Sequence, residues 1–265
     1  MTVAPFDAYA IQYARSVRPS SDYFLGVDPH DGPAPINYYV WLLRNERHAI
    51  LIDTGFNAER AGERNRDFLR CPTEGLLRLG VRPEEIATVV LTHLHYDHAG
   101  NLDLFPNAEF VLQDEEMRFA TGRYMRHALM RMPFALPDVL RAVGLVHAGR
   151  VRFVSGREEL FPGVVLHPIP GHSPGLQAVT AQTARGQICL ASDAAHFFDN
   201  IRHASPFRVV TDVGRALDGH EHVLRLAGGL DRLVPGHDPA IAEIYAPHPD
   251  DPLIFPLHVA PLGQP

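Results

Sequence analysis

The sequence predicts a mixed α/β fold, because short apolar segments of strand length alternate with longer amphipathic segments along its 265 residues. Hydrophobic residues make up 46% of the chain and charged residues 21%, proportions typical of a globular protein. A chain of this length buries a substantial core. No Gly-, Ser- or Pro-rich linker divides it, so we expect one domain over residues 1–265.

Four segments in the first part of the chain carry the apolar and β-branched residues typical of strands. The last of them is a continuous apolar run, which suits a strand buried on both faces. Residues Ala58–Leu79 place leucines among charged residues, a pattern that predicts a helix with Gly80 as its stop. The expected strands are Ala8–Tyr13, Tyr38–Leu43, Ala49–Ile52 and Ala87–Leu91.

The same alternation continues through the second part of the chain. The Pro-rich tail, Ala246–Pro265, contains Leu253, Ile254 and Phe255, so we expect a packed arm. The further strands expected are Glu109–Leu112, Val151–Val154, Val164–Ile169, Leu176–Gln182, Gln187–Ser192 and Leu230–Val234. The further helices expected are Asp114–Arg126, Pro137–Gly144 and Asp212–Ala227.

Charge and composition argue against several function classes. The formal net charge is −7 and no run of Lys and Arg occurs, so we expect no nucleic-acid partner. Met1–Val17 lacks a basic start followed by an apolar region, and no apolar stretch approaches the roughly 18 residues that span a bilayer. We therefore expect a cytoplasmic protein with no membrane partner. Cys71 and Cys189 lack CxxC spacing and are expected to be buried free thiols.

The chemistry is concentrated directly after the apolar run at Ala87–Leu91. The segment Thr92-His93-Leu94-His95-Tyr96-Asp97-His98-Ala99-Gly100 places three imidazoles and a carboxylate within six positions. Neutral imidazole and carboxylate are the nitrogen and oxygen ligands that zinc prefers. Alternation along an extended chain sends His93 and His95 to one side, while Asp97 and His98 can reach a neighbouring position. This arrangement allows two metal ions to bind at adjacent positions.

Three later segments offer further ligands, each just after an expected strand. Any one of these residues, taken alone, is better explained as part of a turn than as a ligand, because Gly, Pro, Asp and His are common in loops. Their order and number favour a metal site. The candidates are His172 in Pro170–Gly175, Asp193 in Ala191–Ala194, and His237 in Pro235–Asp238.

This pattern resembles the metallo-β-lactamase superfamily, in which HxHxDH is followed by a His, an acidic residue and a His. The resemblance extends from about Ile36 to His237 and includes the Asp53-Thr54-Gly55 turn. It implies a four-layer αβ/βα sandwich, two mixed β-sheets flanked by helices, and two zinc ions per chain, with Mn, Fe or Co as substitutes. The implied ligands are His93, His95 and His172 for one ion, Asp97, His98 and His237 for the other, and Asp193 as the bridge.

Two zinc ions about 3.5–4 Å apart can share a hydroxide that attacks a carbonyl at neutral pH. This chemistry suits lactones, esters, thioesters and some amides, so we expect a small-molecule lactone or ester as substrate. Asp97 could carry a proton to the leaving group. Asp53 could orient an imidazole by accepting its second N–H, or could serve only as a turn former.

Within the superfamily, the closest resemblance is to N-acyl homoserine lactonases, which act in quorum quenching. It rests on the His-Leu-His-aromatic-Asp-His-Ala-Gly run, His172-Ser173-Pro174-Gly175 and Gly236-His237-Asp238. One departure is His196, where those lactonases have a Tyr whose hydroxyl contacts the substrate carbonyl. Either this imidazole replaces the phenol as a catalytic donor, or the substrate differs from an acyl homoserine lactone, and the second explanation is favoured. A packed histidine with no catalytic part is an equal alternative.

Other interpretations remain open from the sequence. The chain could hydrolyse thioesters, other esters or cyclic amides, could resemble persulfide dioxygenases with one iron, or could be a non-catalytic binding module. Tyr96 is expected to pack rather than react. Four methionines within residues 117–132 suit an adaptable pocket wall, a homodimer face or ordinary core packing.

Overall fold

The structure is a computed structural model that describes residues 4–26, 30 and 32–264. Seven strands of its first part and one of its tail form a mixed sheet of eight strands in the order β13-β1-β2-β3-β5-β6-β7, with β4 paired to β1. β1 and β2 form a long antiparallel pair, whereas β3, β5, β6 and β7 run parallel to one another. The strands are β1 (Asp7–Pro19), β2 (Pro33–Arg44), β3 (Ala49–Ile52), β4 (Asp67–Phe68), β5 (Thr88–Val90), β6 (Glu109–Gln113), β7 (Val151–Val154) and β13 (Ile254–Pro256).

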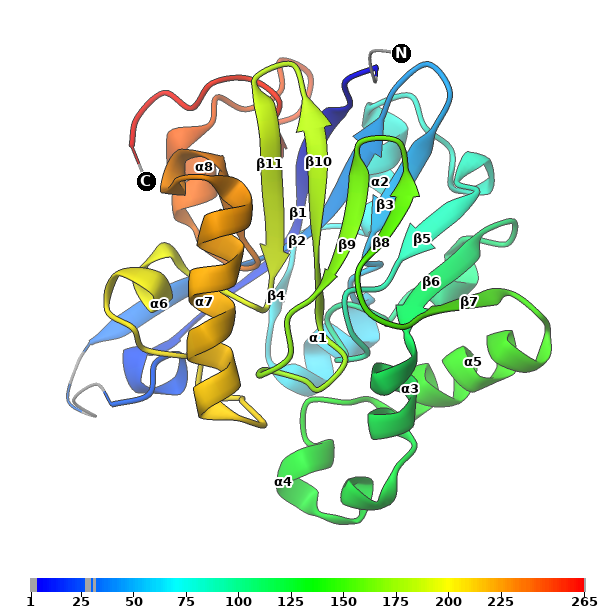
Figure 1. The fold of residues 1–265 in the computed structure, drawn as a ribbon, viewed down its shortest axis with the longest axis vertical. Helices are drawn as coiled ribbons and strands as arrows, with labels where there is room; N and C mark the ends of the chain where they lie inside the picture. Colours follow the sequence, from blue (N-terminus) through cyan, green and yellow to red (C-terminus); the bar gives the residue numbers. More distant parts are fainter. Residues whose placement is uncertain (1–3, 27–29, 31, 265) are drawn as a thin grey trace.

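A second sheet of five strands faces the first, in the order β12-β11-β10-β9-β8 (Figure 1). Its pairs are antiparallel except for β11 and β12, which run parallel. The β10–β11 hairpin passes in front of β1 and β2 in the view of Figure 1. The strands are β8 (Glu158–Phe161), β9 (Val164–Pro168), β10 (Gln177–Thr183), β11 (Gly186–Ser192) and β12 (Leu233–Pro235).

Helices cover the outer faces of both sheets. α7 packs on β10, β11 and β12, while α2 packs on β1 and α5 on β7. Figure 1 shows α7 on the near side of the second sheet, and α4 at the end of the molecule beyond α3. The helices are α1 (Ala58–Arg64), α2 (Pro72–Arg78), α3 (Asp114–Ala120), α4 (Ala128–Arg131), α5 (Leu136–His147), α6 (Phe198–Arg202), α7 (Val213–Ala227) and α8 (Ala240–Ile244).

The burial of β2 shows why the sheets stack in this way. Tyr39, Trp41 and Leu43 belong to the core that the two sheets share, whereas the alternate residues Val40 and Leu42 belong to the core under the helices. Because successive side chains of a strand point to opposite faces, an apolar strand requires a partner on each side. The expected four-layer arrangement of two mixed sheets flanked by helices is confirmed.

The expected helix over Ala58–Leu79 is wrong as a single element. α1 ends at Arg64, because Asn65 adopts a left-handed conformation with φ 53°. The chain then forms the short strand β4, and Pro72 at the first turn of α2 begins a separate helix. Pairing with the β1 edge thus interrupts a segment whose leucine spacing looked continuous.

Other boundaries differ in smaller ways. α3 stops at Ala120, before the Thr121-Gly122 turn, and a 3-10 turn over Arg123–Arg126 follows. The strand expected at Leu230–Val234 begins only at Leu233, after a 3-10 turn over Leu230–Arg232. Strands β8 and β13 and helices α4, α6 and α8 had no counterpart among the expected elements.

The tail is a packed arm as far as Leu257, since β13 pairs with β1 and Leu257 is fully buried, whereas Leu262 beyond it is 75% exposed. Pro265 and Met1 to Val3 lie outside the described residues. Both cysteines are free, as expected, but only Cys189 is buried, whereas Cys71 is partly exposed. No helix in the described ranges is both long and apolar enough to cross a membrane.

Candidate metal centre

The candidate ligands gather where strands of the two sheets end. His93 to His98 follow β5, His172 follows β9, Asp193 follows β11 and His237 follows β12. Two main-chain hydrogen bonds join the sheets at this edge. The Gln177 N–H donates to the Thr92 carbonyl at 3.0 Å, and the Asn37 N–H donates to the His237 carbonyl at 3.0 Å. The backbone therefore brings residues from both halves of the chain to one edge of the sandwich.

One group of possible ligands consists of His93, His95, His172 and Asp193, all buried, with their ligand atoms within 4.8 Å of one another. The His172 Nε2 atom lies 2.9 Å from His95 Nδ1 and 3.1 Å from Asp193 Oδ2. His93 Nε2 lies 3.7 Å from the same carboxylate oxygen. Three imidazoles and one carboxylate oxygen thus converge on a single point.

A second group consists of Asp97, His98 and His237, also buried and within the same distance of one another. The Nε2 atoms of His98 and His237 lie 3.2 Å and 3.1 Å from Asp193 Oδ1. Asp193 therefore turns its Oδ2 toward the first group and its Oδ1 toward the second. A carboxylate in this position can contact two cations at once.

The electrostatics of the cluster suit cations. Burial lowers the pKa of His93 and His95 well below the usual value, which keeps both imidazoles in the neutral form that binds metals. Burial raises the pKa of Asp193, but the neighbouring imidazoles, among them His98 and His237, outweigh burial and hold it well below the usual range. For His98, burial lowers the pKa, yet the carboxylates of Asp193 and Asp53 raise it well above normal. The negative charge that retains a proton there also favours a metal ion.

Two buried imidazole nitrogens that lack a hydrogen-bond partner in the described part of the chain also indicate a metal site. Within the described residues, His93 Nε2 and His98 Nε2 are buried and have no hydrogen-bond partner. Buried polar atoms are almost always partnered, so two such atoms directed at one carboxylate need an explanation. A pair of divalent cations fits, because these donors are nitrogen and oxygen atoms of the kind that zinc prefers.

Residues behind the ligands set the direction of the imidazoles. His98 Nδ1 lies 2.7 Å from Asp53 Oδ2, and His237 Nδ1 lies 2.8 Å from the Asn37 carbonyl oxygen. Asp53 also accepts hydrogen bonds from the Thr92 N–H and hydroxyl, each at 2.7 Å. Such partners fix the ring orientation and leave Nε2 free to coordinate. Asp53 is therefore more than a turn former.

Comparisons with known proteins agree with this geometry. The family described as the metallo-beta-lactamase superfamily matches residues 34–237. The chain belongs to this superfamily. An N-acyl homoserine lactonase of Bacillus cereus is 30% identical over 192 residues, which cover 65% of this chain and 70% of that protein. The N-acyl homoserine lactonase AiiA of Bacillus thuringiensis subsp. kurstaki shows the same identity and coverage.

Solved structures show the same superfamily fold. A quorum-quenching N-acyl homoserine lactone lactonase superposes with a TM-score of 0.75 at 24% identity, covering 90% of this chain and 95% of that one. AidC, a dizinc quorum-quenching lactonase, superposes with a TM-score of 0.69 at 18% identity, covering 90% of each chain. With the superfamily match and the buried His and Asp clusters, these relatives identify the protein as a metal-dependent hydrolase.

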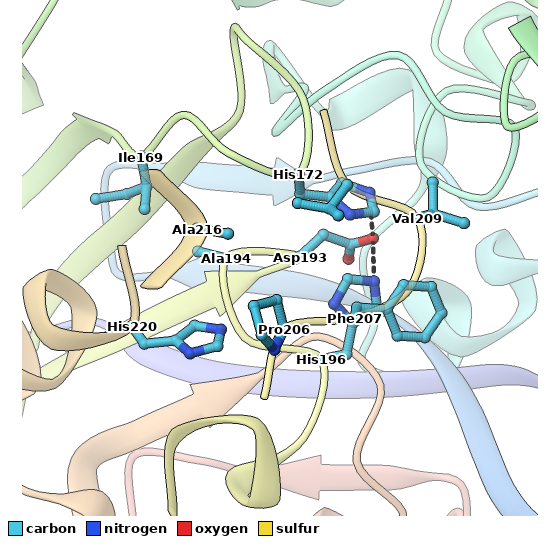
Figure 2. Close-up of a pocket in the computed structure, with 11 residues that line it drawn as sticks. Ile169, His172, Asp193, Ala194, His196, Pro206, Phe207, Val209, Ala216 and His220 are labelled. Carbon is cyan, nitrogen blue, oxygen red and sulfur yellow. Dashed lines mark ion pairs between the residues drawn. The ribbon is translucent and has the colours of Figure 1, made fainter. Parts of the chain in front are cut away.

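His196 lies in the cluster although the superfamily pattern does not include it. Its Nε2 atom is 2.9 Å from Asp193 Oδ2, and its ring stacks on Phe207 with centroids 3.6 Å apart and planes 4° from parallel. Figure 2 shows the Asp193 carboxylate between the rings of His172 and His196. Burial lowers the pKa of His196 to about 3, so the ring is neutral and offers a single N–H.

Glu116 is a site residue that the sequence interpretation missed. It is fully buried on α3 and accepts hydrogen bonds from the N–H groups of Leu94 and Gly175 at 3.0 Å and 3.1 Å, and from the Ser173 hydroxyl. It therefore ties the loop that carries His93 to His98 to the loop that carries His172. Nothing in the local sequence separates Glu116 from the acidic residues that precede it on α3.

Gly236 is required by the close packing of the cluster. A Cβ atom at this position would lie 2.7 Å from the Ser192 carbonyl oxygen and 2.9 Å from Asp193 Oδ1. Ser192 itself has a φ of 48°, uncommon for a residue with a side chain. The turn that presents Asp193 therefore combines a strained residue with a backbone approach that only glycine permits.

A cavity of about 570 Å³ opens beside both groups of ligands. Met130 and Met132 line it, whereas Met117 and Met125 pack against the core. The methionine-rich segment thus serves both as pocket wall and as packing. Tyr96 stacks on Phe56 at 5.5 Å between centroids and also lines the cavity, in agreement with a packing role.

Proposed function

We propose that this protein is a two-zinc lactonase that opens the ring of an N-acyl homoserine lactone or a related small lactone or ester. The observation that carries the proposal is the position of Asp193, with one carboxylate oxygen toward each of two buried ligand groups. The lactonases to which the chain is similar support the substrate class. Since both halves of the chain contribute ligands, the proposal treats residues 1–265 as one hydrolase domain.

The assignment of ligands follows the two groups. His93, His95 and His172 would hold one ion, Asp97, His98 and His237 the other, and Asp193 would bridge them. Zinc suits these donors, and Mn, Fe or Co can replace it. When bound, such ions polarise a carbonyl group and lower the pKa of water to about 7.

The chain's own residues would then position the substrate and move protons. His196 lines the cavity next to Asp193, and once bound ions occupy the Asp193 carboxylate, the single N–H of this imidazole would be free to donate to the carbonyl oxygen of a lactone. Asp97 lines the same cavity, so its carboxylate can accept a proton from the attacking water and pass it to the leaving alkoxide. The apolar wall formed by Phe119, Met130 and Met132 would receive the acyl part of the substrate.

Elemental analysis beside a pH-indicator assay on simple lactones, acyl homoserine lactones and thioesters tests the proposal. We expect close to two zinc ions per chain and hydrolysis of lactones. Asp193→Ala should lose metal and activity, while Asp218→Ala on the exposed face of α7 should retain both. One iron per chain with no hydrolysis across the panel would contradict the proposal and favour an iron oxygenase.

A further inference from the structure

The cavity beside the metal centre gathers positive charge in a chain whose formal net charge is −7. Four arginines line it, together with two carboxylates outside the metal cluster, Asp22 and Glu63. These arginines come from the end of β1, from the end of α1 and just after it, and from the segment after Phe207. They are Arg18, Arg64, Arg66 and Arg208.

Both of these carboxylates already face an arginine. Glu63 pairs with Arg60, which does not line the cavity, and Asp22 lies 3.8 Å from Arg208 Nη1. Among the described residues, Arg18, Arg64 and Arg66 have no carboxylate oxygen within 4.0 Å. Three guanidinium groups next to the metal cluster thus lack a partner of opposite charge in the described parts of the chain.

The neutral contacts of these arginines differ. Arg64 is used structurally, since it donates to the carbonyl oxygens of Met132 at 2.9 Å and Phe134 at 3.2 Å and lies 4.3 Å from the centre of the Tyr96 ring. Among the residues that the structure describes, Arg18 has a single long contact, 3.4 Å to the Arg64 carbonyl oxygen. Arg64 therefore holds the cavity wall, whereas Arg18 remains available to a ligand.

Arg66 is a partly buried residue of the cavity wall. Its Nε donates to the Tyr96 hydroxyl at 3.2 Å and its Nη1 to the Arg64 carbonyl oxygen at 3.0 Å. A guanidinium has five N–H donors, so several remain. The nearby Tyr23 ring also lines the cavity, and its buried hydroxyl has no hydrogen-bond partner among the described residues. In the part of the chain that the structure describes, guanidinium groups with N–H donors to spare and an unpartnered hydroxyl therefore line the same cavity.

We propose that Arg66, assisted by Arg18, binds a carboxylate on the substrate, so that the preferred substrates are lactones or esters that carry a carboxylate. A planar guanidinium matches a carboxylate through two parallel N–H···O bonds, and partial burial strengthens them. An N-acyl homoserine lactone is neutral and offers no negative charge to pair with the guanidinium groups of Arg66 and Arg18. The proposal rests on the proposed hydrolysis at the adjacent metal centre, and it names the substrate class.

A matched pair of substrates tests this preference. We expect the zinc-loaded protein to hydrolyse γ-butyrolactone γ-carboxylate with a kcat/KM about tenfold or more above that of the corresponding γ-carboxamide, mainly through KM. In Arg66→Gln this ratio should fall toward one, and in Arg66→Lys it should be partly retained. Arg225→Gln, an exposed arginine on α7, should keep the wild-type ratio. Equal turnover of acid and amide by the wild type would overturn the proposal.

A binding measurement separates this proposal from the proposed lactonase activity. Cyclopentanone carboxylate and its carboxamide have the same shape but no ester bond, so calorimetric titration reports recognition without hydrolysis. Tighter binding of the carboxylate to zinc-loaded protein, lost in Arg66→Gln, would support the anion site even if no lactone were hydrolysed. A preference that persists in Arg66→Gln would assign the carboxylate to the metal ions and refute the role of Arg66.

Discussion

The Glu116 carboxylate accepts a hydrogen bond from the Leu94 N–H at 3.0 Å, which joins α3 to the centre of the loop that carries four of the candidate ligands. The same side chain also accepts hydrogen bonds from Ser173 and Gly175 in the loop that carries His172. One buried acidic residue outside the metal cluster therefore fixes the position of the two ligand loops relative to each other. Its removal should disturb the site without removing any ligand.

Glu116→Ala should lower the free energy of unfolding by about 3 kcal/mol or more, because three buried donors lose their acceptor. Glu116→Gln keeps one acceptor oxygen and should lose less. Urea denaturation with zinc analysis measures both effects. The neighbouring exposed residue supplies the control, since Glu115→Gln should stay within about 0.5 kcal/mol of the wild type. A wild-type stability for Glu116→Ala would refute the tie between the loops.

Asp53→Asn should weaken metal binding by about 10- to 100-fold, because the amide cannot hold His98 Nδ1 with a full negative charge. Competition with a chromophoric zinc chelator measures the affinity. Asp67→Asn alters an exposed carboxylate paired with Arg15 and should leave the zinc affinity unchanged. Equal affinities for the two variants would show that Asp53 acts only in the turn.

His196→Phe should reduce kcat by about 100-fold with little change in KM, if the imidazole donates to the substrate carbonyl. Phenylalanine can still stack on Phe207 but has no N–H, so zinc content and Tm should stay close to wild type. Steady-state kinetics on a lactone, beside zinc analysis, checks this. Full activity in His196→Phe would support the alternative that the histidine only packs.

Asp97→Asn should slow the release of poor leaving groups by at least about 100-fold, since an amide cannot deliver a proton. Aryl esters, whose leaving groups need no proton, should be affected much less. Comparison of alkyl and aryl esters, at measured zinc occupancy, separates proton delivery from metal binding. A variant that retains both metals and full activity on alkyl lactones would exclude this role.

Stability should depend on pH through His220, a buried residue of α7 whose pKa burial lowers to about 4. The unfolded chain takes up the proton near pH 6.5 and the folded protein only near pH 4, so stability is lost as pH falls across this window. At 1.36 kcal/mol per pKa unit, the loss reaches about 3 kcal/mol.

His220→Leu should flatten this decline, and urea denaturation between pH 4 and 7 measures it. Protonation of the metal-cluster histidines affects the wild type and His220→Leu equally. It therefore cancels in the difference between their free energies of unfolding. The exposed His203→Leu should keep the wild-type pH dependence. An identical slope for His220→Leu would show that the buried imidazole is already protonated in the folded state.

Much of the fold was predictable because strands that are buried on both faces form continuous apolar runs, which can be recognised locally. The runs that became β2, β3 and β5 show this directly in the sequence. The single helix over Ala58–Leu79 failed for a non-local reason. Phe68 pairs with β1, a segment more than fifty residues earlier, and this contact overrides a local leucine pattern that favours a helix.

The residues around the metal cluster were harder to find. Glu116 follows Asp114 and Glu115 in a helix start where acidic side chains normally face water, and only the buried contact to Leu94 separates it from them. Arg66 lay inside the expected helix, and its place in the cavity follows from the left-handed turn at Asn65. The local sequence around Glu116 and around Arg66 does not distinguish either residue from an ordinary surface residue.

The sequence by itself determined the donor chemistry, because His93 to His98 form a dense motif of nitrogen and oxygen ligands directly after a buried strand. The tertiary structure alone decided which oxygen of Asp193 faces which ligand group, and which charges surround the cavity. The physical reason is distance along the chain. A short motif constrains its own geometry, whereas contacts between remote segments depend on how two sheets stack and where each loop turns.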